Sequence, residues 1–570
     1  MKQIIRKSVG INSTTAFPQR QLAWLGFGYL TLIWALSIVV GLGSSNQLTY
    51  HEAFVAQGAR EILSSGDWWY PRIGGLPWLE KPPLPFWLVA AAGWARGDIS
   101  PGVARFPSAL AALGLVWGVS ILAAYRYGPV MAILAGAIQA TTAWTVWRGR
   151  LAEADILLAC VITWAIVAFD RMRNREVQPD RGSPRAETSR AWHVWRWVFF
   201  GLLGITSFIK GTGFGCALVL STVAIVVIWD RDDTLRARLR FPAGWLLAGF
   251  LTVIWPLAMV REHGLKVIGL WLLHVTSRVS TSAAHGIFAR ESWFEYVLNI
   301  LGQGLPWTPL ALIGTFGLVV RGFRTGGKRE FSTTASSAAN AVMGDRLVWA
   351  WALGPFALVS LASARNAHYA IHAMIPWSIW SAHGVSVLGS RLCKRGWCRR
   401  KVARLVFVAL TGLGIAYGLG FWLVGPRFDH RAAEAAFYRQ VGRQTSASEP
   451  LELLYDDWDR EPYPTPFGPI PHDLALRLYY LDRPACWHFN VQSLFDCKTK
   501  APRVGGRSGS DSPVNVIGRD RDLPALRALG EVDVLQSSSG FRWDRAYLLA
   551  QIRNSRAVAI SARGDVQVSR

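Results

Sequence analysis

The stretch LAWLGFGYLTLIWALSIVVGLG, residues 22–43, decides the class of fold. It contains no charged residue, and as a helix it is long enough to cross the hydrocarbon core of a bilayer. The residues before it are basic, but the apolar run is too long for a signal peptide and lacks an A-x-A-type cleavage site. We therefore expect a retained first transmembrane helix.

Similar apolar blocks recur along the chain. Its 570 residues are 51% hydrophobic and only 17% charged, which is too apolar for a soluble protein. The sequence therefore predicts a polytopic α-helical membrane protein of about eleven spans, up to thirteen if weaker segments also cross. The expected spans are residues 22–43, 104–124, 129–147, 156–170, 195–209, 213–229, 243–260, 298–320, 347–362, 369–388 and 405–425.

The net charge of +24 follows from the loops between these spans. With the N-terminus in the cytoplasm, alternation places the Arg-rich loops 171–194 and 389–404 there too, as the positive-inside rule requires. The basic composition is accordingly attributed to membrane topology and not to nucleic-acid binding. An odd number of spans puts the C-terminus outside the cytoplasm, in a periplasm-like space.

The alternation also defines two domains. Residues 1–425 are expected to form the membrane domain, with a first outer loop at 44–103. Residues 82–95 within that loop are too short to cross and are interpreted as an amphipathic or re-entrant segment. Residues 426–570 are expected to form an extracytoplasmic soluble α/β domain, with a strand at LELLYDD and a helix at HDLALRLYYL. The sequence leaves open whether Cys486 and Cys497 form a disulfide there.

Ionisable and aromatic residues of possible function gather on the outer side of this map. An even spread through both halves of the membrane would favour a transport pathway, whereas this one-sided distribution favours an enzyme site at the outer interface. The residues are His51, Glu52, Glu80, Lys81, Asp155, Lys210, His274, Arg278, Arg365, His368 and Tyr369.

An ordered set of short motifs accompanies these residues. They are Gly66-Asp67-Trp68, Glu80-Lys81-Pro82-Pro83, Ala104-Arg105-Phe106-Pro107-Ser108, Arg150-Leu151 with Asp155, Lys210-Gly211, Pro306-Trp307-Thr308-Pro309 and His368-Tyr369. In this order the chain resembles the GT-C fold glycosyltransferases that use polyprenyl-phosphate sugars, in particular the lipid A aminoarabinose transferase and protein O-mannosyltransferase family. The resemblance covers about residues 20–390.

This resemblance implies a multi-pass enzyme of the inner membrane. It would transfer a hexosyl or pentosyl group, with inversion, from a polyprenyl-phosphate donor to a lipid, glycan or protein acceptor on the outer face, as in modification of lipid A or of a cell-envelope glycan. A flippase or transporter of lipid-linked sugars is the alternative from another class. A non-catalytic homologue that binds the lipid-linked sugar is a further one.

The catalytic base is one point of departure from the family. The family pattern has an Asp-Glu pair after the first span, but here the pair is His51 and Glu52. A neutral imidazole can accept a proton near pH 7, so His51 is one candidate base. Glu52 and Asp155 are the others, and loss of transfer activity is a further reading of the substitution.

The leaving phosphate requires cations, since negative charge grows on it as the sugar departs. Lys81, Lys210, Arg278 and Arg365 are the candidates for this contact, and each could instead anchor the protein at the membrane interface. The resemblance also implies a divalent metal ion held by Glu80 and His274.

Overall fold

The computed structural model describes most of the chain as two compact units. The first unit is drawn from Met1–Leu42, Glu80–Pro85 and Arg105–Phe421, and the second from Gly43–Leu79, Phe86–Ala104 and Trp422–Arg570. The described residues are 17–44, 46–173, 185–211, 213–279, 292–325, 345–361, 367–446, 451–455, 463, 465–489, 491, 494, 513–538 and 547–553.

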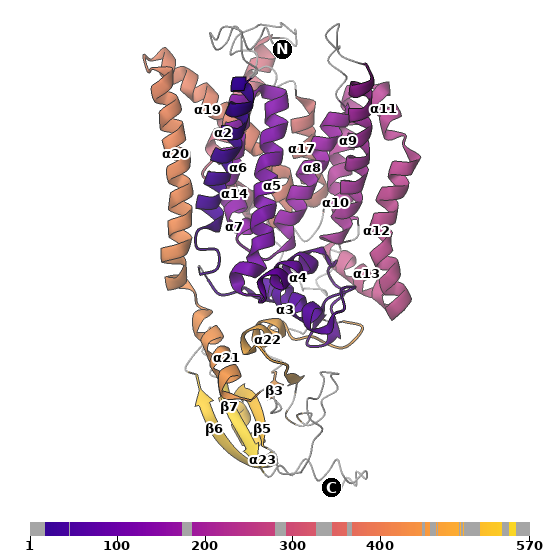
Figure 1. Ribbon diagram of the computed structural model, residues 1–570, viewed down its shortest axis with the longest axis vertical. Coiled ribbons are helices and arrows are strands. Elements are labelled where there is room, and N and C mark those ends of the chain that lie inside the picture. The colour runs from indigo at the N-terminus through magenta and orange to yellow at the C-terminus, as the bar shows by residue number, and fades with distance from the viewer. Residues whose placement is uncertain are drawn as a thin grey trace. The chain divides into compact units, whose positions relative to one another are not determined.

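The first unit is a bundle of helices whose long members run side by side (Figure 1). Apolar residues face both neighbouring helices and the outside of the bundle, as is usual for helices in lipid. The elements are α2 (Phe17–Trp34), η1 (Ala35–Val39), α5 (Pro101–Tyr127), α6 (Pro129–Ala140), α7 (Ala143–Gly149), α8 (Ala154–Arg173), α9 (Arg185–Ile205), η2 (Thr206–Phe208), α10 (Phe214–Asp230), α11 (Asp233–Leu239), α12 (Pro242–His263), α13 (Lys266–Val279), α14 (Trp293–Gln303), α15 (Thr308–Thr325), α17 (Arg346–Ser360), η4 (Ala367–Ala370), α18 (Ile371–Met374), α19 (Trp377–Lys394), α20 (Arg399–Leu419) and η5 (Gly420–Val424).

Every predicted span coincides with one helix or with neighbouring helices of this bundle. Among the described residues, three helices are long and apolar enough to cross a membrane, namely Pro101–Tyr127, Pro242–His263 and Arg399–Phe428. A fourth crossing is counted if α6 and α7, which are bent by 60° at their junction, form one broken span. The predicted number of eleven spans therefore stays a prediction.

The predicted span 298–320 differs most from a single helix. It is divided into α14 and α15 by the segment Gly304–Trp307, which contains Pro306. Proline lacks an N–H and its ring clashes with the preceding turn of a helix, so a break is expected at this position.

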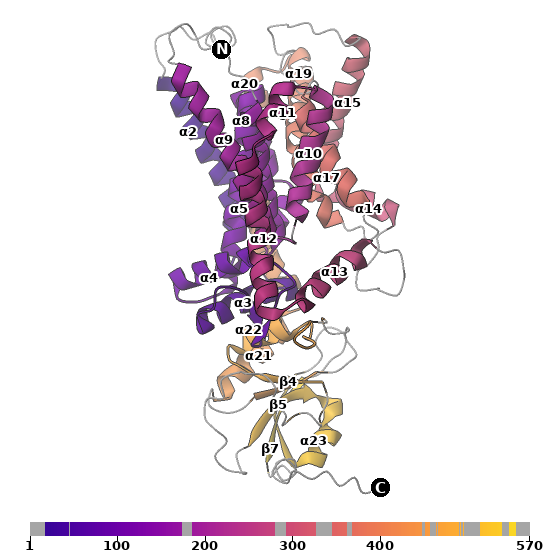
Figure 2. The ribbon, with the colours of Figure 1, turned by 90° about the vertical axis from the view of Figure 1, so that its right-hand side faces the viewer.

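Small residues allow some of the helices to approach closely. A Cβ at Gly384 of α19 would lie 2.1 Å from the backbone oxygen of Leu310 in α15, a pair of helices that Figure 2 shows near each other. A Cβ at Gly418 of α20 would likewise lie 2.1 Å from the oxygen of Leu36 in η1. Backbone contacts of this kind are the usual way in which helices associate in lipid.

A buried charge network joins three helices of the bundle. The guanidinium of Arg126, at the end of α5, forms ion pairs with Asp170 of α8 and with Asp345, which caps the start of α17. The Tyr127 hydroxyl also donates a hydrogen bond to Asp345. Buried charges persist only when they are paired in this way.

The second unit combines the first outer loop with the C-terminal part of the chain. From the loop come α3 (Tyr50–Ser65), the hairpin β1 (Arg72–Ile73) and β2 (Leu76–Pro77), and α4 (Leu84–Arg96), which covers most of the predicted 82–95 surface segment. The C-terminal part supplies η6 (Gly425–Phe428), α21 (Ala432–Gln444), β3 (Leu451–Leu454), α22 (Leu474–Leu481), β4 (Cys486–His488), β5 (Val514–Arg519), η8 (Asp520–Asp522), α23 (Leu523–Leu529), β6 (Glu531–Ser537) and β7 (Tyr547–Arg553).

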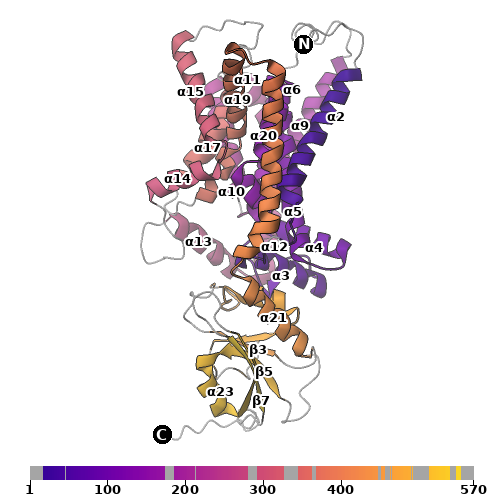
Figure 3. The same cartoon turned by 90° about the vertical axis from the view of Figure 1, so that its left-hand side faces the viewer.

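The C-terminal strands form one five-stranded mixed sheet in the order β4-β3-β5-β7-β6. Figure 3 labels β3, β5 and β7 of this sheet. Strand β3 pairs in parallel with β4 and β5, whereas β7 is antiparallel to both β5 and β6. The predicted strand and helix are present as β3 and α22. Cys486 is disulfide-bonded, and Cys497, its partner in the predicted pair, lies outside the described residues.

The composition of this unit differs from the domain division expected from the sequence, in which the loop 44–103 accompanied the membrane domain. By its contacts, most of that loop groups with the C-terminal part. Alternation of apolar blocks carries no information about which outer segments pack together, so this grouping could not be read from it.

Candidate functional site

A cluster of charged and aromatic side chains lies in the first unit, where three of the sequence motifs meet. Asp155 occupies the first turn of α8, and the Lys210 ammonium forms an ion pair with its carboxylate. The same ammonium lies 4.6 Å from the centre of the Tyr369 ring, a cation–π contact. A helix N-terminus favours a carboxylate in its first turn, which supports Asp155 as an anion there.

Two further side chains interact with Asp155. Arg148, at the end of α7, places Nη1 3.7 Å from Asp155 Oδ2 and 2.5 Å from Glu153 Oε2. His368 interacts electrostatically with Asp155, and its ring centre lies 4.1 Å from that of Tyr369. The predicted residues Asp155, Lys210, His368 and Tyr369 are thus brought together from three distant segments of the chain.

His372, which is not among the residues predicted from the sequence, extends this cluster. It lies in α18, its side chain is fully buried, and neither ring nitrogen has a hydrogen-bond partner in the described part of the chain. Its ring centre is 6.4 Å from that of Phe214, which is in turn 6.2 Å from that of Tyr369. Its place four residues after His368, one helical turn on, was the available signal.

The predicted pair His51 and Glu52 lies in the second unit, in the first turn of α3. Thr49 caps this helix: the Glu52 N–H donates to Thr49 Oγ1 over 3.2 Å, and the Thr49 N–H donates to Glu52 Oε2 over 2.9 Å. Glu52 is completely buried, whereas the His51 side chain is exposed. The Glu52 carboxylate therefore stabilises the helix start as a capping box, and His51 is the accessible member of the pair.

Glu80 and Lys81, two other predicted site residues, belong to the first unit and are partly exposed. Residues 274 and 278 are four apart on α13 and so share one helix face, but the side chains of His274 and Arg278 lie outside the described residues, as does all of Arg365. In the described part of the chain, no group of three or more His, Cys, Asp or Glu side chains could hold a metal ion.

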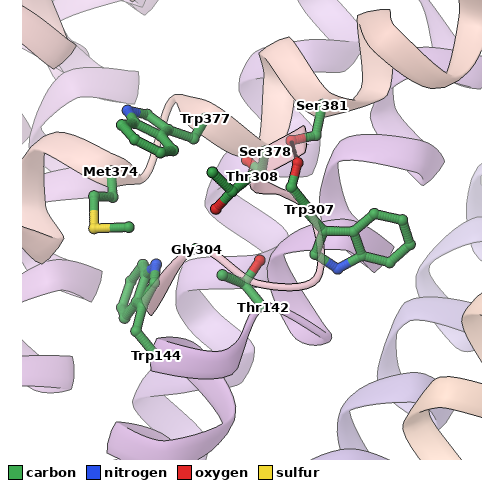
Figure 4. A pocket seen from close by; sticks show the side chains of 9 residues that line it. All are labelled: Thr142, Trp144, Gly304, Trp307, Thr308, Met374, Trp377, Ser378 and Ser381. Carbon is green, nitrogen blue, oxygen red and sulfur yellow. Dashed lines mark hydrogen bonds between the residues drawn. The ribbon is translucent and has the colours of Figure 1, made fainter. Parts of the chain in front are cut away.

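The Pro306-Trp307-Thr308-Pro309 motif borders a small internal pocket of the bundle (Figure 4). The cavity volume of about 10 Å³ has room for no more than about one water molecule, so it is not a substrate site. Trp307 Nε1 donates to Thr141 Oγ1 over 3.0 Å, and Thr308 Oγ1 donates to the Leu301 oxygen over 2.7 Å. The motif therefore holds the α14–α15 break against the α6–α7 bend.

Two other motif arginines also have structural contacts. Arg150 donates to the backbone oxygens of Ile38 and Val40 over 2.8 and 2.9 Å, at the end of η1. Arg105 Nη1 donates to the Leu42 oxygen over 3.1 Å. These contacts satisfy the carbonyl groups that are left without partners where the first helix ends.

Comparison with known proteins places the sequence near membrane glycosyltransferases. Residues 23–274 match the model of the dolichyl-phosphate-mannose-protein mannosyltransferase family. The undecaprenyl phosphate-α-4-amino-4-deoxy-L-arabinose arabinosyl transferase 1 of Sodalis glossinidius is 26% identical over 70% of this chain and 63% of its own length. The corresponding transferase of Edwardsiella ictaluri is 26% identical over 63% of this chain and 59% of its own length. The chain thus spans about three fifths of these relatives.

Solved structures show a similar fold. The crystal structure of ArnT from Cupriavidus metallidurans bound to undecaprenyl phosphate superposes with a TM-score of 0.67, at 17% identity, over 92% of this chain and 97% of that one. The apo oligosaccharyltransferase of Archaeoglobus fulgidus superposes with a TM-score of 0.51, at 13% identity, over 83% of this chain and 65% of that one. The chain therefore has the predicted GT-C type of membrane fold.

Proposed function

We propose that this chain, which resembles the polyprenyl-phosphate-sugar glycosyltransferases in both sequence and fold, is itself such an enzyme. It transfers a sugar from a polyprenyl-phosphate donor to a lipid, glycan or protein acceptor. The observation that carries the proposal is the convergence of Asp155, Lys210, His368 and Tyr369, which belong to three separate motifs of the predicted family set.

The donor is assigned to the polyprenyl-phosphate class from the chemistry of this cluster and from the relatives. Lys210 is about one fifth exposed and lies beside an aromatic ring, so it can meet an anionic phosphate at the cluster. ArnT of Cupriavidus metallidurans was crystallised with undecaprenyl phosphate. Lys81, Arg278 and Arg365 are proposed as further phosphate contacts.

The reaction forms one bond and breaks another at the anomeric carbon. The acceptor hydroxyl gives its proton to a base while its oxygen bonds to the anomeric carbon, and the bond from that carbon to the phosphate oxygen breaks. Attack opposite the leaving group inverts the anomeric centre. The leaving polyprenyl phosphate gains negative charge in the transition state. The cations therefore stabilise the transition state more strongly than they stabilise the bound donor.

His51 is proposed as the base, because its side chain is exposed whereas the Glu52 carboxylate is buried in the helix cap. Asp155 is the second candidate, since it lies in the cluster itself.

A divalent metal ion, when bound by Glu80 and His274, would supply additional positive charge at the phosphate.

The chemistry is proposed to take place on the outer face of the cytoplasmic membrane. In this arrangement about eleven spans cross the inner membrane, the N-terminus is cytoplasmic, and the C-terminal domain, 426–570, is periplasmic. The support is the agreement between the positive-inside rule and the alternation of the predicted spans.

The test is transfer by the purified protein in lipid, with a panel of radiolabelled polyprenyl-phosphate sugars and a native membrane extract as acceptor. Lys210→Gln is expected to lower the rate of labelled product formation by about 10²-fold or more, because one stabilising charge at the leaving group is lost. Lys401→Gln, an exposed position at the start of α20, is the control and should retain the wild-type rate.

The same assay separates the base candidates. Replacing the base should lower the rate by about 10²–10⁴-fold. His51→Ala is expected to do so. An unaltered rate in His51→Ala, with loss in Asp155→Asn, would transfer the role to Asp155. Movement of donor across the bilayer with no labelled product from any sugar would replace the transferase with a flippase.

A further inference from the structure

The residues that lead into His51 are held by the C-terminal part of the chain. The Gln47 N–H donates to Asp429 Oδ2 over 2.6 Å, and the Leu48 N–H donates to the Tyr480 hydroxyl over 2.7 Å. Leu48 is fully buried, so its N–H depends on this hydroxyl for a hydrogen bond. Two consecutive backbone groups just before α3 are thus fixed by side chains more than 380 residues away.

These side chains are themselves oriented. Arg439 of α21 hydrogen-bonds the Gln47 side-chain oxygen, and its guanidinium lies 4.7 Å from the centre of the Tyr480 ring. Tyr480 belongs to α22, so two C-terminal helices meet at the same short segment. The cation–π contact keeps the Tyr480 ring in the position from which its hydroxyl reaches Leu48.

A second contact fixes α3 three turns further along. Arg60 Nη1 donates to the Tyr479 oxygen over 2.9 Å and lies 3.2 Å from Asp482 Oδ1. The Arg60 guanidinium also lies 4.6 Å from the centre of the Tyr479 ring. Since α22 binds α3 both at its start and near residue 60, the helix can neither rotate about its axis nor slide along it without breaking one contact.

We infer that Tyr480, with Asp429 and Arg439, is a positioning residue for His51, and that the C-terminal domain contributes to the rate of transfer by setting the place of this imidazole. The inference rests on the proposed function, because it requires His51 as the base. A displacement of a reacting group by about 1 Å can lower a rate by about 10²-fold, so a loosened α3 start is costly even when the fold persists.

A different role for the C-terminal domain would be to bind the acceptor. Positioning of His51 and binding of the acceptor predict different kinetics. A positioning role lowers kcat and leaves the KM of donor and acceptor unchanged, whereas an acceptor-binding role raises the acceptor KM. A steady-state comparison of variants in the full-length protein therefore distinguishes them.

The decisive variant is Tyr480→Phe, which removes the hydroxyl that accepts from Leu48 and keeps the ring. We expect kcat to fall at least tenfold, with both KM values within twofold of wild type. The matched control is Arg483→Gln, which removes hydrogen bonds to Thr445 Oγ1 and the Ser446 oxygen and leaves the contacts of residues 47–50 in place. It should keep the wild-type kcat.

A second comparison excludes a general loss of folding. In a His51→Ala background the residual rate no longer depends on His51, so adding Tyr480→Phe should cause no further decrease. If Tyr480→Phe only destabilised the protein, it would lower the transfer rate by the same factor in the wild type and in the His51→Ala variant. If Tyr480→Phe does not fold, Arg439→Gln replaces it in the test. This variant keeps the hydrogen bond of the Leu48 N–H, and the same decrease in kcat with unchanged KM values is expected.

The outcomes separate this inference from the function on which it rests. A wild-type protein that transfers no sugar overturns both. Transfer by the wild type with an unchanged kcat in Tyr480→Phe overturns the positioning role alone. A raised acceptor KM at constant kcat assigns the domain to acceptor binding instead, and also overturns it.

Discussion

At the scale of single residues, Asp155 and Lys210 are the most informative pair. The sequence suggested separate roles for them, one as a possible base and the other as a phosphate contact, but the structure joins them in an ion pair. Asp155 is nearly buried and Lys210 only partly exposed, so removal of either partner leaves an uncompensated charge in a poorly solvated place. Their stability effects should therefore be coupled.

A double-mutant cycle tests this coupling. Asp155→Asn and Lys210→Gln should each destabilise the protein, and the double variant should be more stable than the sum of the two effects predicts, by more than about 1 kcal/mol. The measurement is thermal unfolding of the four proteins in one detergent. Effects that add within about 0.3–0.5 kcal/mol would mean that the ion pair contributes nothing to stability.

At the scale of elements, the β1–β2 hairpin shows how a charged residue can stabilise a turn. Gly74 and Gly75 both have positive φ, as a tight two-residue hairpin turn requires. The Glu61 carboxylate, on α3, accepts their N–H groups over 2.8 and 2.9 Å. The turn is therefore tied to the helix that carries His51.

This contact makes the stability of the second unit depend on pH. Burial raises the pKa of the Glu61 carboxyl, in spite of hydrogen bonds from Gly75, Gln57 and Gly74 and the charge of Arg72, all of which lower it. The native state consequently holds this proton more tightly than the unfolded chain. The Glu61 contribution to the free energy of unfolding must then decrease as the pH rises from the ordinary carboxyl range through the raised pKa.

The pH effect is measured as the difference in Tm between wild type and Glu61→Gln from pH 4 to pH 7. The advantage of the wild type should become smaller with rising pH, because the variant has no carboxyl to titrate at this position. A difference that grows with pH would show that the hydrogen bonds from the turn outweigh burial and lower the pKa instead.

The elements also show what the sequence could and could not predict. Long apolar runs such as 104–124 predicted helices because their pattern is local and strong. The capping box of Thr49 and Glu52 was equally local, although Glu52 was predicted only as a candidate base. The ion pair of Asp155 with Lys210 depends on how helices pack and left no sequence signal, whereas the place of His372 four residues after His368 was a local signal.

At the scale of the molecule, the second unit combines the first outer loop with the C-terminal part of the chain. In the sequence these two parts are separated by residues 105–421, which belong to the first unit. Gly74 in the first outer loop lies against Trp487 in β4, and a Cβ added there would be 2.6 Å from the ring. Its neighbour Gly75 has a similar positive φ but nothing within 4 Å of such a Cβ. The two glycines therefore have a similar backbone conformation, but only Gly74 is closely packed.

Two alanine substitutions separate these effects. Gly75→Ala should cost about 1–2 kcal/mol, the penalty for a non-glycine residue at positive φ. Gly74→Ala should cost more than this, because the ring of Trp487 must also move. Limited proteolysis should show the first outer loop and the C-terminal domain becoming susceptible together in Gly74→Ala. Equal effects of the two variants would mean that the contact with Trp487 is easily lost.

The two-part construction of the second unit has a consequence for biosynthesis. Residues 43–79 and 86–104 leave the ribosome early, but the helices that bind α3 come only after residue 422. At ~5–20 residues per second, synthesis of the intervening 105–421 takes about 15–60 s, and during this time Leu48 has no Tyr480 to bind. The nascent chain therefore passes through a long stage in which the start of α3 lacks its C-terminal contacts, and a chain truncated before α22 never gains them.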